Sequence, residues 1–126
     1  MLHQYDLEIC KISIYENYVI NQIKEGIHLE VLHVESLSIL INKHIKNRPF
    51  IYISNRINSY SFDPLVHDSI NKIENLIALV IITNDKTKQG IVQFEKQFSN
   101  KTLMIYEHLD EAISWAKDFF DKKNIQ

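Results

Sequence analysis

The chain has 126 residues, of which 45% are hydrophobic and 24% charged, and its formal net charge is -2. This length and composition are typical of a single globular domain with a substantial core, which we expect to cover residues 1–126. The small net charge provides no general attraction to nucleic acid or anionic lipid. The longest apolar run, residues 76–82, is far shorter than the roughly 20 residues of a membrane helix, and no signal-peptide core is present. We therefore expect a cytoplasmic protein with no nucleic-acid partner and no membrane span.

Two strands are predicted near the amino end of the chain. Residues 7–15 alternate in a way typical of a strand with an apolar face, and residues 18–24 predict a second strand after a turn at Glu16 and Asn17. The two strands are expected to form a hairpin. Cys10, the only cysteine, lies in the first of them, has no disulfide partner within the chain and has no nucleophile motif around it. We expect it to be a small buried apolar residue.

Helices and strands alternate after the hairpin. Apolar residues recur every three or four positions over residues 31–46, which predicts an amphipathic helix. The later expected elements are a buried strand at 50–54, a short helix beginning at Pro64, a central strand at 76–83, a helix at 84–98, a strand at 102–106 and a closing helix from 109. The short helix is expected to have Asp63 as its N-cap and to bury Leu65, Val66, Ile70 and Ile73, and the closing helix to bury Trp115. This order predicts an α/β fold with one mixed sheet, an N-terminal hairpin and about four helices covering both faces.

A polar segment follows the strand at 50–54 without a glycine. Its candidate recognition residues are Ser54, Asn55, Arg56, Asn58, Ser59, Tyr60 and Ser61. In α/β sheets, ligands and partners commonly bind at the carboxyl ends of strands, where this segment is expected to lie. Arg56 can hold a carboxylate or phosphate with two hydrogen bonds, and Tyr60 offers a ring for stacking. The alternative is that these side chains only satisfy the backbone of a turn.

Motifs for catalysis are absent from the sequence. With two glycines in the chain, neither a phosphate-binding loop nor a dinucleotide fingerprint can be formed, and the six histidines lack metal-ligand spacing. Asp63, His67 and Asp68 could group on one helical turn as an acid–base pair or metal ligands, although a solvent-exposed helix face explains them equally well. We therefore expect no catalytic residues, no metal and no cofactor. The alternative is a small enzyme with a site around Arg56, Asp63 and His67.

Four features together point to a known fold family. They are Glu25-Gly26 after the second strand, the strand at 50–54 that runs into a polar loop, the apolar run at 76–83, and the ending from Tyr106 to Ala112 followed by Trp115. Over nearly its whole length, the chain resembles the STAS domain, the fold of the anti-sigma-factor antagonists, and in particular its small stand-alone relatives. The antagonists have an aspartate two residues before a phosphorylatable serine, whereas here Tyr52 precedes Ser54.

The resemblance implies a non-enzymatic binding or regulatory module. It places recognition of a protein partner or a small anion at the strand-to-loop mouth, residues 54–61. Ser54, Ser59 and Ser61 are candidates for phosphorylation by their place only. Whether the protein forms a homodimer is left open by the sequence.

Overall fold

A computed structural model describes residues 2–86 and 101–125, and the side chains of residues 2–86 and 101–122. The strands are β1 (His3–Asp6), β2 (Cys10–Ile14), β3 (Tyr18–Ile23), β4 (His28–Leu29), β5 (Phe50–Asn55), β6 (Ser61–Phe62), β7 (Leu76–Ile82) and β8 (Thr102–Tyr106). The helices are α1 (Val31–Ile45), α2 (Leu65–Asn71) and α4 (Leu109–Ile125). Apart from its first positions, the helix predicted at residues 84–98 lies outside the described residues.

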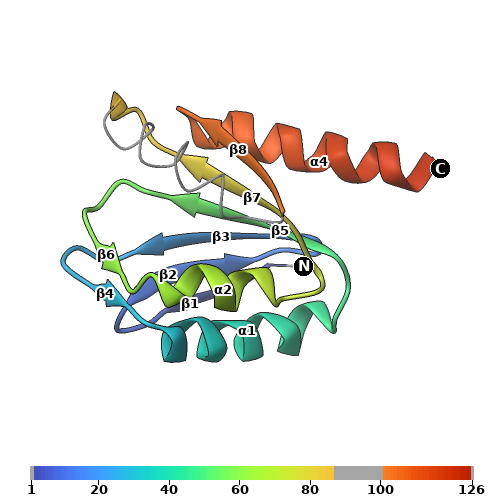
Figure 1. Cartoon of the computed structure of the whole chain (residues 1–126). Helices are drawn as coiled ribbons and strands as arrows, with labels where there is room; N and C mark the ends of the chain where they lie inside the picture. Colours follow the sequence, from blue (N-terminus) through green and yellow to red (C-terminus); the bar gives the residue numbers. More distant parts are fainter. Residues whose placement is uncertain (1, 87–100, 126) are drawn as a thin grey trace.

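One mixed sheet forms the centre of the fold. Its strand order is β1-β2-β3-β5-β7-β8. The pairs β1–β2 and β2–β3 are antiparallel, whereas β3, β5, β7 and β8 are mutually parallel. Helices α1 and α2 lie on one face of this sheet and α4 on the other (Figure 1). The predicted α/β class, the hairpin of β2 and β3, and the alternation of strands and helices are therefore confirmed.

Each face of the sheet has its own apolar cluster. Toward α1 and α2, the buried side chains are Cys10, Ile12, Ile14, Val19, Ile23, Phe50 and Leu76 from the sheet, with Leu37, Ile41 and Ile45 from α1. Toward α4, they are Tyr18, Ile51, Ile53, Ala78, Val80 and Ile82, with Ala112 and Ala116 from α4. Successive residues of a strand point to opposite faces of the sheet. Strands β5 and β7 are therefore apolar at nearly every position, since helices cover both faces.

Three short strands were not predicted. The predicted strand at 7–15 begins only at Cys10, because Leu7 N–H donates to the Cys10 carbonyl (2.8 Å) in a turn that folds the preceding residues back as β1. Strands β4 and β6 pair in parallel as a separate two-stranded sheet. Two residues are too few to give a detectable alternation.

Of the expected burials, that of Leu65 is wrong, that of Trp115 holds only in part, and those of Val66 and Cys10 are right. Leu65 is 60% exposed, whereas Val66 is buried and Ile70 and Ile73 are partly buried against the apolar cluster that faces α1 and α2, as expected. Trp115 is half-buried, with its ring 5.2 Å from that of Phe119, because the small Ala112 and Ala116 are the residues of α4 that are fully buried against the sheet. Cys10 is fully buried as expected.

Candidate functional site

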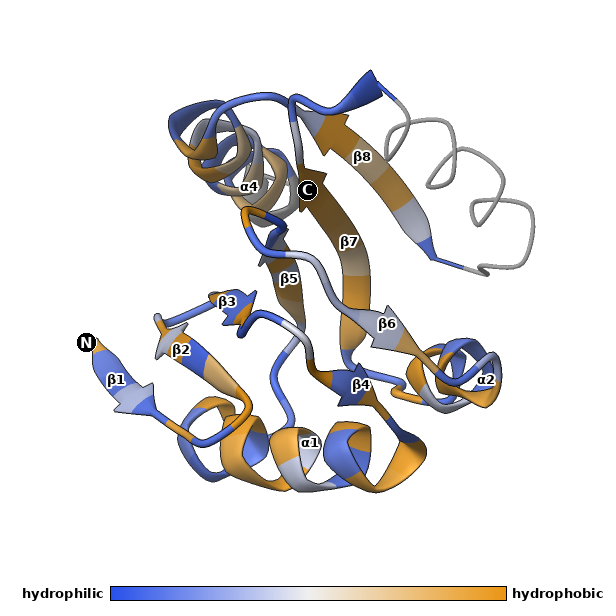
Figure 2. Ribbon diagram, turned by 90° about the vertical axis from the view of Figure 1, so that its left-hand side faces the viewer, coloured by the Kyte–Doolittle hydropathy of each residue, from blue (hydrophilic) through white to orange (hydrophobic). Residues whose placement is uncertain are grey.

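The loop after β5 is held by the connection between β3 and β4. Gly26 N–H donates to the Ser59 carbonyl (2.8 Å), and Ser59 N–H donates to Glu25 Oε2 (2.6 Å). Gly26 has a φ of 79°, a left-handed conformation that glycine adopts without steric cost. Ser61 N–H then donates to the Ile27 carbonyl (3.0 Å), where β4 and β6 run side by side (Figure 2). The loop is therefore braced along its length by backbone hydrogen bonds.

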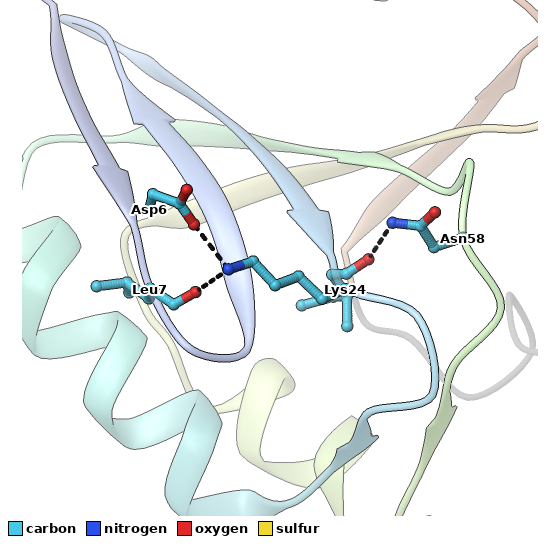
Figure 3. Close-up of polar contacts among 5 residues, drawn as sticks. Asp6, Leu7, Lys24 and Asn58 are labelled. Carbon is cyan, nitrogen blue, oxygen red and sulfur yellow. Dashed lines mark hydrogen bonds and ion pairs between the residues drawn. The ribbon is translucent and has the colours of Figure 1, made fainter.

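Side chains add to this bracing at the end of β3. Asn58 Nδ2 donates to the Ile23 carbonyl (3.1 Å), as drawn in Figure 3. In the same view, Lys24 Nζ donates to Asp6 Oδ1 (2.7 Å) and to the Leu7 carbonyl (2.6 Å). The Lys24 ammonium lowers the pKa of the Asp6 carboxyl. The loop and the β1–β2 turn are thus both fastened to the end of β3.

A cavity of about 110 Å³ lies between the sheet and helices α1 and α2. Its described walls are mostly apolar and come from both helices and from the sheet: Ile23, Leu29, Val34, Leu37, Ile41, Phe50, Phe62, Val66, Ile70, Ile73, Leu76, Leu79, Ile81 and Leu103. Polar side chains line it as well, among them Tyr52, Ser54, Arg56, Tyr60 and His67. A concave site that is mostly apolar, with a few polar groups, is the usual form of a small-molecule site.

Strand β5 and the loop after it supply most of these polar groups. Tyr52 Oη accepts a hydrogen bond from Asn21 Nδ2 (2.6 Å), and the Arg56 guanidinium carbon lies 5.7 Å from the centre of the Tyr60 ring. Burial raises the pKa of the Tyr52 phenol and the nearby Tyr60 raises it further, while the Asn21 hydrogen bond and the charge of Arg56 act in the opposite direction. The Tyr52 hydroxyl is therefore protonated at neutral pH. It can donate a hydrogen bond as well as accept one.

The seven predicted recognition residues fall into three groups. Ser54, Arg56 and Tyr60 line the cavity, whereas Asn55 lines a second, polar cleft with Thr83, Asn84, Asp85, Glu107 and His108 at the carboxyl ends of β7 and β8. Arg56 lines both hollows. Asn58, Ser59 and Ser61 hold the loop, and Ser61 Oγ also lies 2.8 Å from His28 Nδ1. Recognition by this set stays a prediction.

Tyr52 and Asn21 are not among the predicted site residues. Both were counted as strand residues, yet Asn21 is fully buried on the same face as Val19 and Ile23. An amide at an inward position of an otherwise apolar alternation is the signal that could have identified it.

The alternative enzyme site is only partly assembled. Arg56 and His67 line the same cavity, and the His67 ring packs edge-on against Phe62 with 5.1 Å between centroids. Asp63 does not line the cavity, and its Oδ1 accepts the backbone N–H of Leu65 (2.9 Å) at the beginning of α2. In residues 2–86 and 101–125, no group of three or more His, Cys, Asp or Glu side chains is placed to hold a metal ion. None of the helices in this described part is both long enough and apolar enough to cross a membrane.

The mixed sheet, its helices and the strand-to-loop cavity define a STAS-like fold of the SpoIIAA type. This assignment is supported by structural similarity to an uncharacterised protein of the DUF3478 family from Shewanella loihica PV-4. That protein is described as having a SpoIIAA-like fold. The two structures are 10% identical in sequence, align over 92% of each chain and give a TM-score of 0.57. No protein-family model matches the sequence, and no curated protein matches it. The resemblance to the STAS fold is thus confirmed at the level of structure.

Proposed function

We propose that the chain is a single-domain, non-enzymatic binding module of the STAS-like class. Its recognition site is the mouth formed by residues 54–61. The observation that supports this most directly is that Ser54, Arg56 and Tyr60 line one cavity together with apolar walls from α1, α2 and the sheet. The loop is braced before any ligand arrives, so little ordering is needed on binding.

A small anion is favoured over a protein partner as the first ligand. The polar groups line a concave space rather than a flat exposed surface, and that shape fits a small molecule. Arg56 supplies a permanent positive charge with a planar set of donors that suits a carboxylate or phosphate. Binding of such a ligand would be how the module exerts a regulatory role toward a partner.

The enzyme alternative is less well supported. A site using Arg56, Asp63 and His67 would need all three around one space. Asp63 is instead engaged at the beginning of α2, where its carboxylate accepts a backbone N–H. Pro64, not Asp63, is the N-cap of α2, and the Asp63 carboxylate satisfies one of the free backbone N–H groups at the beginning of the helix, which needs no catalytic role.

The proposal is tested with Arg56→Ala and Tyr60→Ala. Each is expected to lower the free energy of unfolding by less than about 1.5 kcal/mol, because neither side chain belongs to the apolar clusters' fully buried core. Both are expected to weaken retention of the anion that the wild type keeps from cell extract, measured by native mass spectrometry. Arg48→Ala is the matched control, since Arg48 donates to the Ile45 carbonyl and does not line the cavity. If both variants unfold like core mutants, or keep every ligand of the wild type, the loop is structural and the proposal fails.

A further inference from the structure

We infer that the cavity binds a monocarboxylate with a small apolar body, and that Tyr52, oriented by Asn21, donates a hydrogen bond to its carboxylate. The inference rests on the proposed function and names the ligand class of the same site. It goes beyond the loop residues, because Tyr52 lies inside β5 and Asn21 inside β3.

The size of the cavity limits the apolar body of the ligand. The volume is about 110 Å³, whereas an apolar protein cavity of about 150 Å³ accepts a molecule of benzene. A single ring, or an alkyl chain of about the same number of carbon atoms, therefore fits only if its polar end reaches the mouth. Most of the walls, such as Leu37, Val66 and Leu103, offer no hydrogen bonds, so the body of the ligand has to be mainly apolar. Ser38, His67 and Asn71 are the polar lining residues on the side of the helices.

The polar side of the cavity is arranged along one edge of β5. Tyr52 and Ser54 are two residues apart and therefore point to the same face of the sheet, and Arg56 follows two residues further on. The Tyr52 hydroxyl accepts from Asn21, so its own proton is left to donate. Ser54 is 5% exposed and lines the cavity. The row thus offers two hydroxyl donors and one guanidinium.

This donor set suits a carboxylate better than a phosphate. A carboxylate has two oxygens and a single charge, which the guanidinium of Arg56 balances. Among the described residues that line the cavity, Arg56 is the only one that is charged at every physiological pH. A phosphate monoester would bring a second charge into a mostly apolar space with no further cation to neutralise it, and that costs binding energy.

Asn21 is best explained as a positioning residue for Tyr52. It is fully buried between Val19 and Ile23, where an apolar side chain would pack without loss. Its Oδ1 has no hydrogen-bond partner among the described residues, so the amide lowers stability at this position. What the amide does provide is the 2.6 Å hydrogen bond from Nδ2 that fixes the direction of the Tyr52 hydroxyl.

Calorimetric titration and chemical-shift mapping on full-length labelled protein test the inference. The probes are benzoate, benzyl alcohol, phenylphosphonate and inorganic phosphate, which share or lack the ring and differ in charge. We expect benzoate to bind with one site per chain and to shift the amide signals of β5, α1 and α2. Benzyl alcohol and phosphate should bind at least about tenfold more weakly, because each lacks one half of the recognised structure.

Variants separate the head of the ligand from its body. Tyr52→Phe should weaken benzoate about tenfold or more and leave benzyl alcohol unchanged, since a hydrogen bond to a charged group is lost. Asn21→Leu should lower the preference for benzoate over benzyl alcohol, which a purely structural defect would not do. Tyr15→Phe is the control, because Tyr15 stacks on Tyr18, part of the apolar cluster that faces α4. If Tyr52→Phe fails to fold, Ser54→Ala provides the same comparison from the next donor of the row.

Several outcomes would overturn the inference. If benzoate binds equally well to the wild type, Tyr52→Phe and Ser54→Ala, these hydroxyl groups are not donors to the ligand. If none of the four probes binds, the cavity does not bind a small monocarboxylate. If phenylphosphonate or phosphate binds as well as benzoate and loses affinity in Arg56→Ala, the preference for a carboxylate is wrong. The proposed function would still stand in that case. The proposed function fails separately, by the retention experiment on cell extract.

Discussion

Cys10, which is fully buried, and Tyr52, which is partly buried, are groups whose ionisation connects stability to pH. Cys10 is fully buried on the sheet face that is covered by α1 and α2, and burial raises the pKa of its thiol from 9.0 to about 11. The Asn21 amide, which also contacts Tyr52, acts in the opposite direction. Burial raises the pKa of the Tyr52 phenol as well. The folded protein therefore favours the protonated, neutral form of both groups.

We predict that the protein loses stability between pH 9 and pH 11. In this interval the folded state holds the Cys10 proton and the unfolded state releases it, so the free energy of unfolding falls as the pH rises. The contribution is fully present below about pH 9 and is reduced by about 2 kcal/mol at pH 11. Urea unfolding of wild type and Cys10→Ala at pH 8 and pH 11 measures it. The variant should show a smaller loss, because only the tyrosines whose pKa values are raised, Tyr52 among them, remain to contribute. An identical loss in the two proteins would contradict the assignment.

Helix α1 is followed by two residues with positive φ angles, although neither of them is glycine. Lys46 and Asn47 have φ angles of 56° and 62°, so two consecutive residues adopt the left-handed conformation. Lys46 N–H donates to the Asn42 carbonyl (2.8 Å), which satisfies one of the last acceptors of the helix. The left-handed conformation is costly for a residue with a Cβ, and glycine commonly occupies this position.

We predict that Lys46→Gly raises the free energy of unfolding by about 0.5–1 kcal/mol, because glycine adopts the left-handed conformation without a clash. The matched control is Lys43→Gly, at another exposed lysine inside α1, which should lower the free energy of unfolding by about 1 kcal/mol. Thermal and urea unfolding of the two variants at neutral pH compares them directly. If both variants lose stability equally, the cap geometry contributes nothing.

At the scale of the whole molecule, we predict that purified, tag-free protein holds no tightly bound transition metal. The described residues bring no three ligating side chains together, and the raised pKa of Cys10 disfavours the thiolate that a metal requires. Elemental analysis by mass spectrometry is the measurement, with the buffer as blank. One zinc or iron per chain would contradict the prediction. Sedimentation of the same sample would decide whether the protein is a monomer or a homodimer, which the sequence left open.

Local patterns in the sequence determined most elements of this fold. The recurrence of apolar residues every three or four positions placed α1 to within one residue of its observed end, and continuous apolar runs located β5 and β7. These signals are reliable because the periodicity of a helix or strand depends on neighbouring residues alone. The same reasoning placed a polar segment after β5, which includes Ser54, Arg56 and Tyr60.

The tertiary structure alone decided what those elements form together. The pairing of β4 with β6 and the packing of Trp115 against the sheet depend on contacts between segments far apart in the sequence. The cavity also depends on such long-range contacts, because its walls come from α1, α2, β3, β5, β7 and β8. Asn21 and Tyr52 are 31 residues apart and meet only because β3 and β5 are parallel neighbours. Periodicity tells which face a side chain occupies, whereas packing of distant elements decides which side chain it meets there.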